Sequence, residues 1–194
     1  MYDRYLFIGL GGSGGSTLGR IKEALRTWLA EHNLAPDIPA GWQFLHIDTP
    51  TVSDSDPPLL ADEYLGLVTS SVQFSNVQQM LDSDINLHEE IQTWRVEPTG
   101  LNVSITKGAG QFRAVGQTIS IAYSKRIKTK IEQSLARLSS KEAKAEIAEV
   151  YGSVTGKLAG SESPLRIVIV SSLAGGTGAG LLQTVCDIVR ALDT

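Results

Sequence analysis

Residues 165–180 of the chain read LRIVIVSSLAGGTGAG, and this stretch decides the fold. Its apolar, β-branched first half predicts a buried strand of a parallel sheet over Leu165–Ser171. The glycine-rich loop Gly175–Gly180 follows, and apolar residues then recur at helical spacing as far as Leu192. A strand, a glycine loop and a helix in this order present the unpaired N–H groups and partial positive charge of a helix N-terminus to an approaching anion.

A second unit of the same kind opens the chain. Tyr5–Ile8 predicts a short buried strand, the loop Gly9–Ser16 follows, and helical periodicity predicts a helix over about Gly15–Glu31. By itself this loop satisfies the G-x-G-x-x-G pattern of a Rossmann dinucleotide site, and it is also compatible with simple tight turns. The second loop favours one site that holds a di- or triphosphate from two sides, because a Rossmann fold does not require it.

The rest of the sequence continues the alternation of strands and helices. The expected elements are strands over Trp42–Ile47 and Leu101–Ile105, a long helix over Ile119–Leu138 and a more charged helix over Lys141–Tyr151. The segment 50–98 starts with a turn-rich run and shows weak helical patterning only around Val77–Leu81 and Leu87–Trp94, so we interpret it as an insertion. The alternation predicts an α/β fold of three layers with a parallel sheet. We expect one Rossmann-like domain over residues 1–194, itself incomplete, with segment 50–98 inserted in it.

The composition argues against several kinds of partner and binding site. Of the 194 residues 42% are hydrophobic and 20% charged, as in ordinary globular domains, and the net charge of −4 gives no reason to expect nucleic acid or a membrane as partner. Cys186 is the sole cysteine, which leaves no disulfide and no cysteine zinc site within the chain. Tyr5–Ile8 is too short for a signal peptide or a membrane span, so the cytoplasm is the expected location. We expect His46 to be a packed or a surface histidine rather than a catalyst.

The two loops and two further motifs resemble the tubulin/FtsZ superfamily, in the family's order. SSLAGGTGAG over 171–180 is similar to the GGGTG-small-G signature loop, with alanine in place of the first glycine. FIGLGGSGGS over 7–16 resembles the first FtsZ loop, FLHIDT over 44–49 resembles the segment that ends in Asn-Thr-Asp, and KGAGQ over 107–111 resembles the loop near the γ-phosphate. The long insertion and the QFRAVG continuation at 111–116 look more like the divergent bacterial tubulin-like proteins than like FtsZ.

The resemblance implies a site for GTP or GDP in which backbone N–H groups hold the phosphates. The first loop would face the α- and β-phosphates, the second would cradle the β-phosphate with the Thr177 hydroxyl as an extra donor, and Ala109 and Gly110 would sense the γ-phosphate. Asp48, an acid where the family has an amide, would repel phosphate unless it holds Mg²⁺ through water. The implied binding residues are Gly11, Gly12, Ser13, Gly14, Ser16, Asp48, Ala109, Gly110, Gly175, Gly176, Thr177 and Gly178.

The resemblance also implies a GTP-dependent assembly or switch protein, whose subunits stack head to tail or join other subunits of a bacterial complex. In the family, the guanine-reading asparagine and the acidic loop that completes hydrolysis lie beyond the second glycine loop. We therefore expect this chain alone to bind nucleotide weakly and to hydrolyse GTP poorly. Two alternatives stay open: a Rossmann-type enzyme that uses NAD or SAM at the first loop, and a non-hydrolysing interaction module whose degenerate nucleotide site stabilises the fold.

Overall fold

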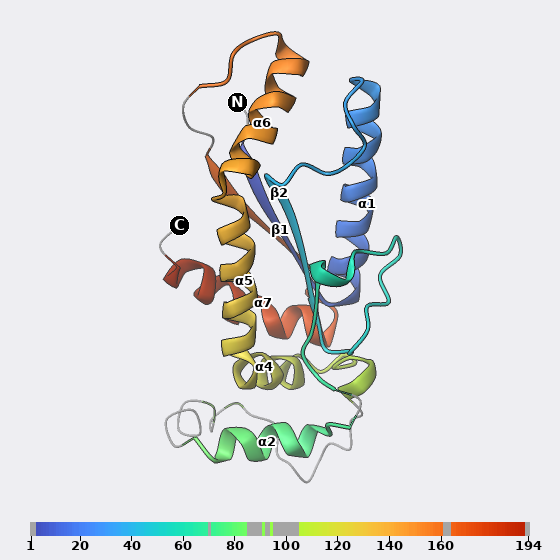
Figure 1. Cartoon of the computed structure of the whole chain (residues 1–194). Helices are drawn as coiled ribbons and strands as arrows, with labels where there is room; N and C mark the ends of the chain where they lie inside the picture. The colour runs from blue at the N-terminus through green and yellow to red at the C-terminus, as the bar shows by residue number, and fades with distance from the viewer. Residues whose placement is uncertain are drawn as a thin grey trace.

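The computed structural model describes residues 3–69, 71–84, 91, 94, 105–160 and 164–192. These residues form a parallel sheet in the order β3-β2-β1-β4 (Figure 1). The strands are β1 (Arg4–Leu10), β2 (Trp42–Asp48), β3 (Tyr64–Gly66) and β4 (Leu165–Ser171). The two strands that precede the glycine loops, β1 and β4, are neighbours in the sheet, so both loops leave the same end of the sheet side by side.

Helices cover both faces of the sheet, with α1 on one face and α5 on the other (Figure 1). This arrangement confirms the predicted α/β fold of three layers. In the described ranges, no helix is both long and apolar enough to cross a bilayer. The helices are α1 (Gly11–Glu31), α2 (Phe74–Asp82), α4 (Arg113–Ala122), α5 (Ser124–Leu138), α6 (Lys141–Thr155) and α7 (Gly176–Ala191), and short 3-10 turns form η1 (Ala61–Glu63) and η2 (Ile105–Lys107).

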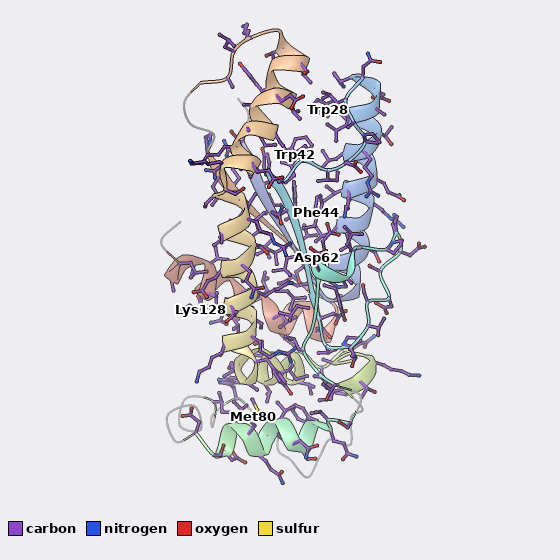
Figure 2. The ribbon with its side chains drawn as sticks, in the orientation of Figure 1. Trp28, Trp42, Phe44, Asp62, Met80 and Lys128 are labelled. Carbon is purple, nitrogen blue, oxygen red and sulfur yellow. The ribbon has the colours of Figure 1, made fainter. Side chains whose placement is uncertain are left out.

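Strand β2 buries different side chains on its two faces, because successive side chains of a strand point to opposite sides. Leu45 and Ile47 are fully buried in the same apolar cluster as Ile127 and Ile131 of α5. On the face toward α1, the Trp42 ring lies 6.2 Å from the ring of Trp28 (Figure 2). The sheet thus has two apolar interfaces, as expected for a parallel sheet between helices.

A buried ion pair joins α1 to the segment 50–98. Lys22 of α1 is only 4% exposed, and its Nζ lies 2.5 and 2.6 Å from the two carboxylate oxygens of Glu63 in η1. The same ammonium group lies 5.7 Å from the centroid of the Phe44 ring on β2. A lysine this deeply buried requires a partner, and Glu63 supplies it.

The third strand of the sheet lies inside the segment 50–98 rather than at Leu101–Ile105. Strand β3 pairs with the end of β2, with His46 opposite Tyr64 and Asp48 opposite Gly66. It spans three residues, which is too short to show a period-two pattern in the sequence. Of the expected strand, residues 101–104 lie outside the described residues and residue 105 begins η2.

Arg126 of α5 makes hydrogen bonds at the end of β3. Its guanidinium group donates to the carbonyl oxygens of Leu67, at 2.9 Å, and of Gly66, at 3.1 Å. In the same segment, α2 confirms the helical patterning around Val77–Leu81, whereas most of the expected helix over Leu87–Trp94 lies outside the described residues.

Helix α1 begins at Gly11, four residues before the predicted start at Gly15. The reason is direct packing between the backbones of β1 and the first turn of α1. A Cβ placed on Gly9 would lie 2.6 Å from the Gly14 carbonyl oxygen, and one on Gly14 would lie 2.8 Å from the Val170 carbonyl oxygen. The glycines therefore allow the helix to begin in direct contact with the strands, instead of forming a loop before it.

The predicted long helix over Ile119–Leu138 is two helices, α4 and α5, which meet at Tyr123 at a sharp angle (Figure 1). Tyr123 has φ −105° and ψ 14°, outside the helical region. Ile119 and Ile127 are both fully buried in the same core, so the apolar spacing continues across the bend. For this reason the prediction of one helix was wrong although its apolar positions were right.

Candidate phosphate-binding site

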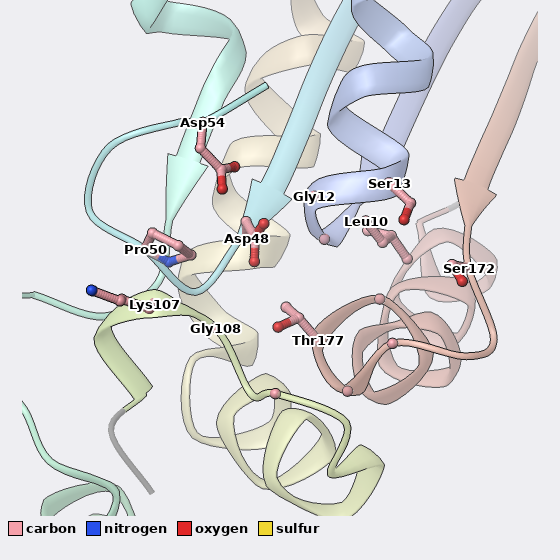
Figure 3. A pocket seen from close by; sticks show the side chains of 15 residues that line it. Leu10, Gly12, Ser13, Asp48, Pro50, Asp54, Lys107, Gly108, Ser172 and Thr177 are labelled. Carbon is pink, nitrogen blue, oxygen red and sulfur yellow. The ribbon is translucent and has the colours of Figure 1, made fainter. Parts of the chain in front are cut away.

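The site is a cavity of about 240 Å³ at the carboxyl ends of β1, β2 and β4 (Figure 3). Ligands of open α/β sheets bind at this end of the strands. The cavity is lined by Leu10, Gly11, Gly12, Ser13, Asp48, Pro50, Asp54, Lys107, Gly108, Gly110, Ser172, Gly175, Gly176, Thr177 and Gly178.

Two helices begin at this cavity without a side chain that caps their N-terminus. The residue before α1 is Leu10 and the residue before α7 is Gly175, and neither makes a side-chain bond to the first turn. Neither first turn contains an acidic residue. Of the other helices, α6 is capped by Ser140, whose hydroxyl accepts from the Ala143 N–H at 3.0 Å, whereas α4 and α5 also begin without a side-chain cap. The uncapped first turns of α1 and α7 therefore offer N–H groups and partial positive charge to the cavity.

The segment that follows η2 forms a third wall and is attached to the second glycine loop. Gly176 N–H donates to the Gly110 carbonyl oxygen at 2.8 Å, and Ala109 N–H donates to Thr177 Oγ1 at 3.0 Å. Because Thr177 Oγ1 accepts this bond, its own proton is available to donate to a ligand. Ala109 itself is fully buried and does not line the cavity.

Acidic and basic side chains both line the cavity. Asp48 is nearly buried, at 5% exposure, and its Oδ1 accepts from the Thr49 N–H at 2.7 Å. Asp54 and the exposed Lys107 complete the charged part of the lining (Figure 3). Burial raises the pKa of the Tyr64 phenol well above its usual value, and the negative charges of Asp48 and Asp54 raise it further.

The structure brings most of the expected site residues to one place. Gly11, Gly12, Ser13, Asp48, Gly110, Gly175, Gly176, Thr177 and Gly178 all line the cavity. Gly14 instead lies against β1 and β4, Ala109 is buried behind Thr177, and Ser16 stands half-buried on α1 outside the lining.

Sequence reasoning missed six of the lining residues: Leu10, Pro50, Asp54, Lys107, Gly108 and Ser172. Lys107 and Ser172 lie within motifs that were recognised, so their positions could have been inferred. Asp54 gave no signal, because it lies in a turn-rich run whose path depends on β3. No group of three or more His, Cys, Asp or Glu side chains that could hold a metal ion occurs in the described part of the chain.

The protein is an α/β protein with a parallel sheet, and two of its helices begin with glycines at one cavity, an arrangement found in many phosphate-binding sites. A family model described as tubulin-like matches residues 6–193, so the chain belongs to the tubulin-like family. Searches of curated proteins and of solved structures returned no significant match.

Proposed function

We propose that this chain binds GTP or GDP, with the nucleotide phosphates in the cavity between α1 and α7, and that it serves as a GTP-dependent assembly or switch protein. The single observation that supports this most strongly is the pair of uncapped, glycine-led helix N-termini at one cavity. Membership of the tubulin-like family favours a guanine nucleotide over other phosphate ligands.

The proposed phosphate contacts come from backbone N–H groups. The first turn of α1 offers those of Gly11, Gly12 and Ser13, and the first turn of α7 offers those of Thr177 and Gly178. The cavity, at about 240 Å³, is smaller than the ~300–1,000 Å³ of pockets that enclose a whole drug-sized ligand. The cavity therefore suits the phosphate chain, with the base outside it.

A divalent cation fits the acidic side of the cavity. Mg²⁺ is typically held by one or two carboxylates together with substrate phosphates, and Asp48 and Asp54 supply carboxylates beside the proposed phosphate position. Bound there, Mg²⁺ would neutralise charge between the phosphates and these two acids. Asp48 is already oriented by Thr49, which donates to Oδ1, so its carboxylate is held in place before a ligand arrives.

The assembly part of the proposal rests on the family. Head-to-tail contacts between identical subunits extend into filaments when they do not close. Light scattering with GTP should then rise steeply above a threshold protein concentration, and it should stay low with GDP. Scattering that is strictly linear in protein concentration, with either nucleotide, would count against assembly and favour a non-polymerising module.

The experiment that tests nucleotide binding is competition against a fluorescent GTP analogue bound to the chain. The competitors are GTP, GDP, ATP, NAD and inorganic triphosphate, each with and without Mg²⁺. The proposal expects GTP and GDP to compete best, and inorganic triphosphate to compete measurably because the cavity holds phosphates. Competition by NAD with no effect of triphosphate would instead assign the first loop to a Rossmann-type dinucleotide site.

A further inference from the structure

A fully buried histidine, His46, lies between the first glycine loop and the segment that carries Asp54. His46 is on β2, and both ring nitrogens have a partner. Its Nε2 lies 3.1 Å from the Gly11 carbonyl oxygen, and its Nδ1 lies 3.2 Å from Ser53 Oγ. One imidazole ring thus contacts both the first glycine loop, through Gly11, and the segment next to Asp54, through Ser53.

The Gly11 carbonyl assigns the direction of the first hydrogen bond. A carbonyl oxygen only accepts, so Nε2 carries a proton and donates to Gly11. The Ser53 hydroxyl can serve Nδ1 as donor or acceptor. Ser53 Oγ in turn lies 2.9 Å from Ser55 Oγ and accepts from the Ser55 N–H at 3.3 Å.

Packing on both sides holds the imidazole ring in place. A Cβ on Gly15 would lie 2.2 Å from the ring, so α1 approaches His46 with no space between them. On another side the Tyr64 ring lies 5.1 Å away, centroid to centroid. Since the ring has no room to turn, its hydrogen bonds have a fixed geometry.

The bond from His46 to the Gly11 carbonyl holds the peptide group that also carries the Gly12 N–H. In a planar trans peptide the C=O of one residue and the N–H of the next point in opposite directions. The Gly11 carbonyl is directed at His46, behind the loop, so the Gly12 N–H is directed away from His46, and Gly12 lines the cavity. A donor on the carbonyl also polarises the same peptide and strengthens its N–H as a donor.

We propose that His46 is a positioning residue that couples phosphate binding at Gly12 to the segment around Asp54. The inference rests on the proposed function. The same ring that orients the Gly12 N–H holds Ser53, the neighbour of the lining residue Asp54. By reciprocity, phosphate that stabilises the loop also stabilises the position of residues 53–55, and disorder in that segment weakens phosphate binding.

The test uses His46→Met, His46→Gln and Ser53→Ala, with His32→Met as the matched control. His32 follows the C-terminal end of α1, is exposed, and its ring contacts Trp28; it is not among the residues that line the cavity. Two quantities are measured: the dissociation constant for GTP, and the rate of amide hydrogen exchange in residues 51–56 with and without saturating GTP.

In the wild type GTP should slow exchange in residues 51–56. His46→Met should bind GTP about tenfold more weakly, since one buried hydrogen bond that orients the loop is lost, and saturating GTP should no longer slow exchange there. His46→Gln should recover part of the affinity because its amide N–H reaches Gly11. Ser53→Ala should lose the GTP-dependent protection with a smaller loss of affinity, and His32→Met should behave as wild type.

Wild-type affinity and protection in both His46→Met and Ser53→Ala would overturn the coupling and leave the proposed function intact. If His46→Met does not fold, Ser53→Ala decides alone, because Ser53 is half-buried in a loop. A wild type that binds neither GTP nor inorganic triphosphate would overturn the proposed function, and the coupling with it.

Discussion

Gly11 of α1 and Gly178 of α7 touch through their backbones, with no space for a side chain on either. A Cβ on Gly11 would lie 2.9 Å from the Gly178 nitrogen, and a Cβ on Gly178 would lie 2.7 Å from the Leu10 carbonyl oxygen. Gly11 also has φ +68°, in the left-handed region. The distance between the two helix N-termini is therefore fixed by the absence of two side chains, and the cavity depends on it.

Replacement of Gly11 by alanine should damage both the fold and the site. The left-handed conformation costs a non-glycine residue roughly 1–2 kcal/mol, and the contact with Gly178 adds about 1–3 kcal/mol of overpacking. Gly156→Ala is the matched control, because Gly156 also has φ +68° but nothing lies within 4 Å of its Cβ position. Urea unfolding should show a larger loss for Gly11→Ala than for Gly156→Ala, and only Gly11→Ala should weaken GTP binding. Equal losses in the two variants would mean that the contact between the loops is unimportant.

Alanine should have opposite effects on stability at two other helical glycines, because one is tightly packed and the other is not. A Cβ on Gly180 would lie 2.4 Å from the Gln117 nitrogen and 2.7 Å from the Arg113 carbonyl oxygen, so Gly180→Ala should cost about 1–3 kcal/mol. At Gly152 of α6 the nearest atom would be 3.6 Å away, so Gly152→Ala should stabilise by about 0.5–1 kcal/mol through helix propensity. Thermal unfolding measures both. A neutral or stabilising Gly180→Ala would show that α4 and α7 do not pack this closely.

Lys107 should strengthen binding of triphosphate more than of diphosphate. Among the described residues that line the cavity, it alone carries a positive charge, and it is exposed at the rim. Lys107→Gln should weaken GTP binding about two- to fivefold, the range expected for an exposed ion pair, and GDP binding less. The difference should shrink as the salt concentration rises. Lys144→Gln on α6 is the control, and equal losses for GTP and GDP in Lys107→Gln would place the lysine away from the γ-phosphate.

The raised pKa of Tyr64 predicts a loss of stability at alkaline pH. The half-buried phenol stays protonated in the folded chain above about pH 10, where an unfolded tyrosine loses its proton, so the free energy of unfolding falls as the pH rises. Tyr64→Phe should lose about 1 kcal/mol at neutral pH, because the bond from the phenol to the Pro50 carbonyl is absent. Its stability should then fall less than that of the wild type above pH 10. Parallel alkaline slopes for the two proteins in urea unfolding would show that Tyr64 does not titrate in this way.

The sequence predicted the strands with the strongest local patterns and both glycine loops, because apolar runs and glycine-led helices are local signals. β4 has the predicted bounds, and β2 differs from its prediction by one residue. The bend at Tyr123 escaped prediction because the apolar spacing is the same on both sides of it. β3 and Asp54 depend on contacts distant in sequence, such as Arg126 with the end of β3 and Glu63 with Lys22.

Among the expected site residues, Gly14 and Ala109 lie outside the cavity lining: Gly14 packs against backbone atoms of β1 and β4, and the Ala109 N–H donates to Thr177. A glycine motif shows where a backbone must come close to something, but it does not say whether that is a ligand or another strand. For His46 the sequence left a packed and a surface position open, and the structure shows the packed one, since the residue is fully buried. Its bond to Gly11 could not have been foreseen, because the two residues are 35 positions apart.

The most direct measurement combines stability and GTP affinity in Gly12→Asp and Gly175→Asp, each beside its Asn counterpart. No atom lies within 4 Å of the Cβ position at either glycine, unlike Gly176, where a Cβ would lie 2.7 Å from the Gly110 carbonyl oxygen. An acid at a helix N-terminus should leave the melting temperature unchanged or raise it, yet repel phosphate. If the two helix ends hold one set of phosphates, both Asp variants stay folded and each loses at least about tenfold in GTP affinity, more than its Asn counterpart. Wild-type GTP affinity in a folded Gly175→Asp would contradict the shared site.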